Sequence, residues 1–262
     1  LRLKILILKP SSLGDVIQAM PVLRLLKLHW PESDIFWWID SGLASLLEED
    51  RDLKGVVRFK RRRWVKPVNW PEAVRSVRWL RRQNFDLVID LQCLFRSGMF
   101  AWLANGKLLV GLDEAREGAR GFYDIAVRRD SFYTHAADWY LAVLKRLNIP
   151  TERQFDWIPE RKFVSAGIKS KWSADAARWI ILQPGARWLN KRWPIENFTE
   201  LVRRIAAARA EFRFTIMGRA DDSAAGAALA QAAPQQCLDL TGKISLPEMI
   251  EWIRLGELMI SN

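Results

Sequence analysis

The chain has 262 residues, half of them hydrophobic, a composition typical of a globular protein with one large or two ordinary domains. Its 41 Lys and Arg residues exceed its 30 Asp and Glu residues, and the net charge of +11 favours anionic partners such as nucleic acid, phosphorylated small molecules or an anionic membrane face. No apolar run approaches the roughly 18 residues that span a bilayer, and the first run is too short for a signal peptide. We therefore expect a soluble, cytoplasmic protein whose Cys93 and Cys237 are reduced core thiols.

The first predicted unit consists of a strand over 5–8, a loop over 9–14 and a helix over 16–28. In an open parallel sheet such a loop lies at the carboxyl end of the strand, where the start of the helix presents free N–H groups to an anion. Asp15 has two interpretations: it caps the helix, with Gln18 three residues later, or it takes a proton from a bound ligand. Pro21 predicts either an early kink or a helix that starts nearer Met20.

The rest of the first half is predicted to form strands over 34–39, 55–59, 87–91 and 108–112 and helices over 41–49, 71–83, 96–103 and 135–147. Asp50 and Asp52 form an Asp-x-Asp pattern that can hold a divalent cation, although a solvated acidic turn is the favoured interpretation. Residues 60–66 form the densest basic cluster, either a solvated loop or an anion site. A second basic stripe, either a solvated face or a contact with an anionic membrane, consists of Arg75, Arg78 and Arg82.

Residues 148–173 contain two prolines, scattered charge and no long period, which predicts a linker with a short strand or turn inside it. The second half then repeats the pattern of the first, with strands over 179–182, 212–217, 238–240 and 258–261 and helices over 194–208, 222–232 and 245–255. The Gly- and Pro-containing basic loop over 183–193 follows the first of these strands. Each half is therefore predicted to carry one anion-accepting sheet edge, and the two edges are expected to face a shared cleft.

The sequence KPSSLGDVIQAMPVL (residues 9–23) resembles the opening of the ADP-heptose:lipopolysaccharide heptosyltransferases, bacterial inverting glycosyltransferases of the GT-B architecture. Segments 60–66, 88–98, 111–124 and 183–194 resemble the same family, in the same order. The resemblance implies an α/β fold with two Rossmann-like domains facing a cleft, an N-terminal acceptor-binding domain over 1–158 and a C-terminal nucleotide-sugar-binding domain over 159–262. The chain ends at Asn262, before the family's Asp-Ser/Thr-Gly-x-x-His motif, so we expect the second domain to be truncated at its C-terminus.

In that family the aspartate of the first loop is the proposed general base, which favours this role for Asp15. The resemblance assigns the acceptor side to Ser11, Ser12, Gly14, Arg62, Arg63, Lys66 and Arg116. It assigns the donor side to Lys191, and more weakly to Thr241, Gly242 and Lys243, which are as well explained as a strand-to-helix turn. It also places Cys93 where the family usually has glycine, so that a side chain narrows the site.

These assignments predict an inverting, metal-independent transfer of heptose from ADP-heptose to the Kdo/heptose inner core of lipopolysaccharide, with no cofactor. Asp15 takes the proton of the attacking hydroxyl, and Lys191 offsets charge on the leaving diphosphate. The enzyme is expected to contact the cytoplasmic face of the inner membrane peripherally and not to bind nucleic acid. Two alternatives remain: a non-catalytic basic protein that binds nucleic acid or anionic lipid on a degenerate transferase fold, and a related transferase that uses another nucleotide-sugar or acceptor.

Overall fold

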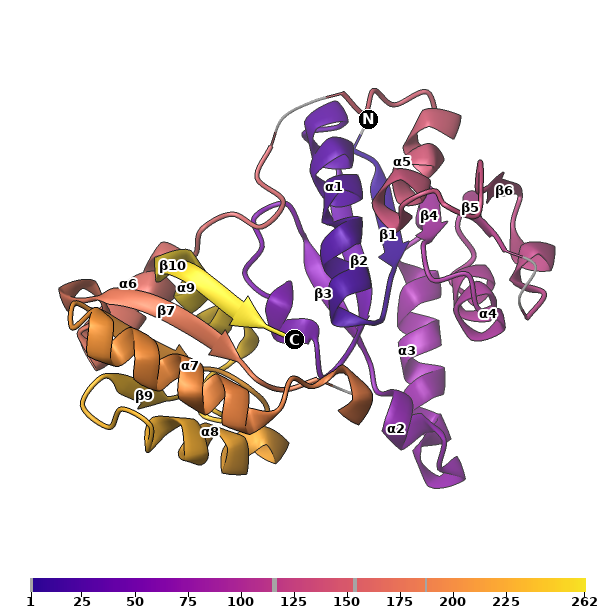
Figure 1. Ribbon diagram of the computed structural model, residues 1–262. Helices are drawn as coiled ribbons and strands as arrows, with labels where there is room; N and C mark the ends of the chain where they lie inside the picture. Colours follow the sequence, from indigo (N-terminus) through magenta and orange to yellow (C-terminus); the bar gives the residue numbers. More distant parts are fainter. Residues whose placement is uncertain (1, 115–116, 153–154, 187) are drawn as a thin grey trace. The chain divides into compact units, whose positions relative to one another are not determined.

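A computed structural model describes residues 2–114, 117–152, 155–186 and 188–262. The chain forms two compact units, Leu1–Pro159 and Glu160–Asn262, and each is built on a parallel sheet flanked by helices (Figure 1). This confirms the predicted α/β class with two Rossmann-like domains. Among the described residues, no helix is both long and apolar enough to cross a bilayer.

The first unit contains a six-stranded sheet in the order β3-β2-β1-β4-β5-β6, all neighbours being parallel. Its strands are β1 (Lys4–Leu8), β2 (Asp34–Asp40), β3 (Gly55–Phe59), β4 (Leu87–Asp90), β5 (Leu108–Asp113) and β6 (Ile125–Arg128). Its helices are α1 (Leu13–His29), α2 (Arg61–Trp64), α3 (Trp70–Arg82), α4 (Phe95–Leu103) and α5 (Ala136–Arg146). The strand order reverses between β1 and β4, and in such sheets ligands bind at the carboxyl ends of the strands near this point.

The centre of this sheet is strand β1, which is buried because β2 and β4 cover both of its edges and helices cover its faces. Leu6 and Leu8 form one core with residues of α3 and α4, and the alternating Ile5 and Ile7 point to the other face. Trp38 of β2 lies in the first core, stacked on Phe59 at a centroid distance of 4.2 Å. The apolar runs of the sequence are therefore strands buried on both faces.

The second unit contains a four-stranded parallel sheet in the order β10-β7-β8-β9. Its strands are β7 (Arg178–Gln183), β8 (Phe212–Ile216), β9 (Cys237–Asp239) and β10 (Gly256–Ser261). Its helices are α6 (Lys162–Trp172), α7 (Ile195–Ala208), α8 (Ser223–Ala230) and α9 (Leu246–Leu255). Ser245 caps α9 and donates from N and Oγ to Glu248 Oε2 at 2.7 and 2.8 Å, which forms a capping box.

Three local predictions are wrong, and one of the two alternatives for Pro21 is excluded. Helix α1 runs through Pro21, so a start near Met20 is excluded; burial of its residues against the unit outweighs the one backbone hydrogen bond that proline removes. Residues 41–49 form only a 3₁₀ turn, because Asp40 Oδ1 accepts a hydrogen bond from Gly42 N and Glu49 adopts a left-handed φ of 67°. Strand β6 lacked a predicted counterpart, and helix α6 occupies part of the predicted linker.

Candidate functional site

Asp15 lies in the first turn of α1, at the edge of the sheet where β1 ends. Ser12 is the N-cap residue and donates its N–H and its Oγ–H to Asp15 Oδ2 at 2.9 and 2.7 Å. The predicted pairing of an Asp15 cap with Gln18 is therefore wrong, because the helix begins earlier, at Leu13. Among the described residues, Asp15 Oδ1 has no hydrogen-bond partner. The carboxylate is thus oriented through one oxygen, and the other is available to a ligand.

Lys9, at the end of β1, is a buried cation near this carboxylate and is absent from the predicted site. Its side chain is only 4% exposed, its Nζ donates to the Leu91 carbonyl at 3.0 Å and lies 4.9 Å from the centre of the Tyr140 ring. Burial lowers the pKa of Lys9, while the negative charges of Asp15 and Asp90 act in the opposite direction. A lysine directly after a buried strand was the available sequence signal.

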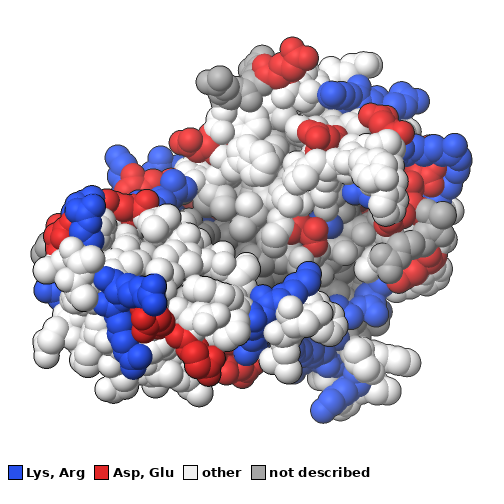
Figure 2. All heavy atoms as spheres, viewed as in Figure 1, with Lys and Arg blue, Asp and Glu red and all other residues white. Residues whose placement is uncertain are grey.

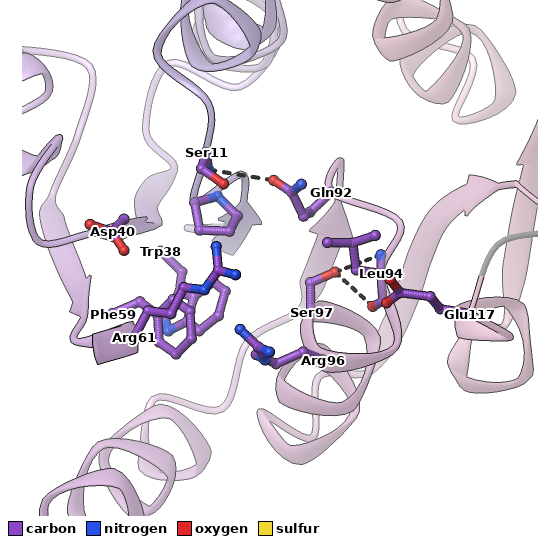
Figure 3. Close-up of a pocket in the computed structure, with 11 residues that line it drawn as sticks. Ser11, Trp38, Asp40, Phe59, Arg61, Gln92, Leu94, Arg96, Ser97 and Glu117 are labelled. Atoms are coloured by element: carbon purple, nitrogen blue, oxygen red, sulfur yellow. Dashed lines mark hydrogen bonds between the residues drawn. The ribbon is translucent and has the colours of Figure 1, made fainter. Parts of the chain in front are cut away.

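A cavity of about 140 Å³ opens beside the β1–α1 loop, at the carboxyl ends of β1, β2, β3 and β4 (Figure 3). It is lined by Pro10, Ser11, Trp38, Asp40, Phe59, Arg61, Gln92, Leu94, Arg96, Ser97 and Glu117. Trp38 and Phe59 supply aromatic surface, and the side chains of Arg61 and Arg96 approach the cavity from different elements (Figure 3). Ser11 N donates to Gln92 Oε1 at 3.4 Å across its rim. Two guanidinium groups beside aromatic rings suit an anionic sugar.

A wider basic groove of about 880 Å³ adjoins this cavity and shares Asp40, Phe59 and Arg61 with it. The remaining lining residues of the groove are Ser41, Gly42, Arg58, Lys60, Arg62 and Arg63. Lys60 pairs with Glu72, and Arg63 lies 3.8 Å from the same carboxylate. Arg61 and Arg62 form no ion pair with any carboxylate in the described part of the chain. These two cations are therefore available to an anionic ligand.

Predicted acceptor residues fall into three groups. Ser11 lines the cavity, and Arg62 and Arg63 line the groove. Ser12 and Gly14 lie at the start of α1, and Lys66 is exposed but lines neither space. Arg116 lies outside the described residues. The prediction missed Arg61 and Arg96, although both belong to segments whose resemblance to the family was noted.

Asp90, at the end of β4, is fully buried and holds the loop that forms one side of the cavity. Its Oδ1 accepts from Gln92 N and its Oδ2 accepts from the Tyr123 hydroxyl, both at 2.8 Å. Burial raises the pKa of Asp90, and these hydrogen bonds oppose that effect. The network fixes the loop so that Gln92 faces the cavity.

Cys93 follows in this loop, with a left-handed φ of 58°. Its thiol donates to the Leu112 carbonyl at 2.8 Å and accepts from Glu114 N at 3.3 Å. Burial raises its pKa to about 11. The cavity lining includes Gln92 and Leu94 but not Cys93, so the predicted narrowing by this side chain is not seen there.

The Asp-x-Asp pair is occupied by an arginine of α1. Arg24, 5% exposed, donates to both Asp50 oxygens and to Asp52 Oδ2. Asp50 is itself 7% exposed, so the expected solvated turn is in fact a buried ion-pair cluster. No group of three or more His, Cys, Asp and Glu side chains in the described residues is placed to hold a metal ion.

In the second unit, the predicted donor residues after β9 form a tight turn. Thr241 donates from N and Oγ1 to Asp239 Oδ1 at 3.0 and 2.6 Å, and Lys243 Nζ donates to the Asp239 carbonyl at 2.8 Å. Gly242 has φ of 68°, and a Cβ there would lie 2.8 Å from Ala220 Cα. These contacts show that Thr241, Gly242 and Lys243 stabilise a turn.

Lys191 lies in a 3₁₀ turn of the loop after β7 and is exposed. No carboxylate of the described residues pairs with it. In the same loop, Gly185 allows close approach of Asp222, since a Cβ at residue 185 would lie 2.6 Å from Asp222 Oδ2. Asp222 accepts from Arg219 N at 3.0 Å and lies 3.5 Å from Arg192, so the loops after β7 and β8 are tied together.

Two Rossmann-like units, each with a parallel sheet, are the architecture of GT-B type proteins, and the first unit carries a basic, aromatic-lined cavity at the carboxyl edge of its sheet. Residues 73–262 match the family model of glycosyltransferase family 9 (heptosyltransferase). The chain therefore belongs to glycosyltransferase family 9.

Several similar curated proteins are lipopolysaccharide heptosyltransferases. Lipopolysaccharide heptosyltransferase 1 of Pseudomonas aeruginosa is 30% identical over 257 residues, covering 92% of this chain and 69% of that protein. The core heptosyltransferase OpsX of Haemophilus influenzae is 22% identical and lipopolysaccharide heptosyltransferase 1 of Escherichia coli K12 is 26% identical; the matches cover 74% and 76% of this chain. The chain spans 54% and 64% of those two proteins.

Solved structures share the fold. A glycosyltransferase family 9 protein from Veillonella parvula superposes with a TM-score of 0.86 at 23% identity, covering 100% of this chain and 76% of that one. The Escherichia coli heptosyltransferase WaaC with ADP-2-deoxy-2-fluoro heptose gives 0.84 at 23% identity, covering 99% and 82%.

Proposed function

We propose that this protein transfers heptose from ADP-heptose to the Kdo/heptose inner core of lipopolysaccharide, with inversion and without a metal ion. The observation that carries the proposal is the Asp15 carboxylate, held through Ser12 with one oxygen that has no partner among the described residues. Asp15 does not itself line the basic cavity of Arg61 and Arg96, which reaches the same β1–α1 loop at Pro10 and Ser11. Family membership supports the glycosyl transfer, and the relatives' names support the heptose and the lipopolysaccharide core. The reaction would take place at the cytoplasmic face of the inner membrane.

The acceptor would bind through its acidic groups. Arginine recognises carboxylate and phosphate oxygens with two parallel hydrogen bonds, and a guanidinium remains charged at every physiological pH. Arg61 and Arg96 in the cavity and Arg62 and Arg63 in the groove offer such contacts. The aromatic surface of Phe59 offers the apolar face of a sugar ring a place to pack.

In the chemical step, Asp15 Oδ1 would accept the proton of the attacking acceptor hydroxyl. The hydroxyl oxygen forms a bond to the anomeric carbon from the face opposite the diphosphate, and the bond to the diphosphate breaks with its electron pair, which inverts the configuration. Lys191 would offset the charge that develops on the diphosphate. A positioned general base contributes typically 10² to 10⁴ in rate.

The experiment compares Asp15→Asn with Ser12→Ala in the full-length protein, using ADP-heptose and a Kdo-containing acceptor, with and without chelator. Asp15→Asn removes the base, whereas Ser12→Ala removes the hydrogen bond from Ser12 Oγ to Asp15 Oδ2 and keeps both the carboxylate and its hydrogen bond from Ser12 N. We expect kcat to fall at least about 10²-fold for Asp15→Asn and less than about tenfold for Ser12→Ala. Equal losses in the two variants would assign Asp15 to helix capping instead. Loss of wild-type transfer with chelator would contradict the metal-free mechanism.

A further inference from the structure

The segment from α2 to the end of α3, residues 61–82, presents apolar side chains to solvent. Val65 is 74% exposed, Val68 81%, Trp70 58% and Val74 46%. The opposite side of the segment is anchored in the core: Trp64 packs against Phe59 and Phe100, and Leu80 is fully buried. The exposed side chains are therefore not a loosely packed end of the core. A cluster of exposed valines and a tryptophan on a soluble surface indicates an interaction site.

The same segment carries much of the positive charge of the chain. Residues 61–82 contain eight Lys and Arg residues and a single acidic residue, Glu72, whereas the net charge of the whole chain is +11. Glu72 is engaged by Lys60 and Arg63. Among the described residues, no carboxylate pairs with any of the arginines of α3, which are Arg75, Arg78, Arg81 and Arg82. Figure 2 shows basic side chains beside uncharged surface at the end of the first unit where α2 lies in Figure 1.

Apolar and basic residues follow one another along one face of α3. Trp70, Val74 and Arg78 are spaced by four residues, which places them in one row, and Arg81 comes three residues later, close to the same row. The buried residue Leu80 lies on a different face. A helix with this arrangement can lay tryptophan and valine into the interface of a bilayer while its arginines remain at the level of the headgroups.

We propose that residues 61–82 dock this protein on a bilayer containing anionic phospholipids. Charge complementarity favours the anionic surface. The exposed valines and tryptophan favour a bilayer over a nucleic acid, because phosphates bind arginine but provide no apolar surface for valine. Trp70 is suited to the membrane–water interface, where its ring has an apolar and a polar side. The proposal rests on the proposed function in one respect, the lipid-linked acceptor. Arg61 to Arg63 of α2 line the groove, so docking would bring the groove to the bilayer surface where such an acceptor lies.

The test is flotation of the full-length protein with vesicles of phosphatidylglycerol and phosphatidylethanolamine, beside vesicles of phosphatidylcholine. The variant Arg75→Ala with Arg78→Ala should bind the anionic vesicles about thirtyfold more weakly, since each cation near such a surface contributes roughly 1 kcal/mol. The matched control, Arg203→Ala with Arg213→Ala, removes the same charge from exposed positions of the second unit and should change binding less than about threefold. Equal weakening by both pairs would overturn the proposal.

A second measurement tests insertion of the apolar side chains. In a Cys237→Ser background, an environment-sensitive fluorophore at Val68→Cys should shift to shorter wavelength with anionic vesicles, and the same fluorophore at the exposed position of Phe132→Cys should not. Val65→Ser with Val68→Ser should weaken binding about tenfold while the circular dichroism spectrum is unchanged. No shift at position 68, or binding of polyribonucleotide tighter than of vesicles through the same arginines, would overturn the proposal.

Transfer to a water-soluble, deacylated acceptor separates this proposal from the proposed function. The Arg75→Ala, Arg78→Ala variant should retain wild-type transfer to that acceptor, because neither residue lines the cavity or the groove. Vesicle binding through residues 61–82 without any transfer would leave docking supported and the proposed activity wrong. Transfer to the soluble acceptor without vesicle binding through residues 61–82 would support the proposed activity and overturn the docking proposal.

Discussion

The arginines of the cavity allow a direct test of how the acceptor is recognised. We expect Arg61→Gln and Arg96→Gln each to raise the KM for an acidic, water-soluble acceptor and to leave kcat nearly unchanged. The structure gives each guanidinium a place in the cavity lining, so each can bind one acidic group of the acceptor. A hydrogen bond to a charged group contributes roughly 1.5 to 3 kcal/mol, which corresponds to a loss of about tenfold to 150-fold in kcat/KM per variant.

The assay measures initial rates over a range of acceptor concentrations at saturating donor. Arg75→Gln serves as the matched control, because it removes an exposed arginine that lines neither the cavity nor the groove. An acceptor whose carboxylates are esterified should reduce the difference between wild type and both cavity variants. The reasoning is refuted if Arg61→Gln and Arg96→Gln change kcat/KM by no more than Arg75→Gln does. A fall in kcat with unchanged KM would instead assign these arginines to the transition state.

Three further predictions concern the framework around the site. Arg24→Met should lower the free energy of unfolding by about 3 to 5 kcal/mol in urea titrations, because it leaves the buried Asp50 beside Asp52 without a cation; a loss below about 1 kcal/mol would contradict the buried ion-pair cluster. Cys93→Ala should be about 1 kcal/mol less stable than Cys93→Gly, since only glycine adopts the left-handed φ of 58° without strain, and the reverse order would argue against that strain. Burial raises the pKa of the Cys93 thiol to about 11, so the folded state holds this proton more tightly than the unfolded state, whose thiol has a pKa near 9. The stability difference between wild type and Cys93→Ala should therefore be constant below pH 9 and shrink as the pH rises toward 11, and a difference that grows over this range would contradict the burial of the thiol.

Hydrophobic patterning predicted most of the framework. The strand over residues 55–59 has the bounds of β3, and the other predicted strands overlap observed ones, because buried parallel strands are short apolar runs bounded by turn formers. Helix α6 was missed because its residues carry scattered charge, and strand β6 because its apolar run is only three residues long. Each packs against other elements of its own unit. Residues 41–49 show the converse, since a local side-chain hydrogen bond of Asp40 accompanies a 3₁₀ turn in place of the helix that the pattern favours.

For the individual polar residues of the site, the sequence and the tertiary structure determined different things. The sequence by itself identified the segments of the site, since Asp15, the cluster over 60–66 and the loop over 183–193 each follow a predicted strand, and parallel strands place such loops at one edge of their sheet. Only the tertiary structure decided which side chain does what. It pairs Asp15 with Ser12 rather than Gln18, ties the Asp-x-Asp pair to Arg24 from a distant helix, and brings Arg61 and Arg96 to one cavity. The physical reason is that periodicity records only whether a residue is buried, whereas the partner of a charged group depends on which strands lie side by side, and the contacts that fix strand order join residues far apart in the chain.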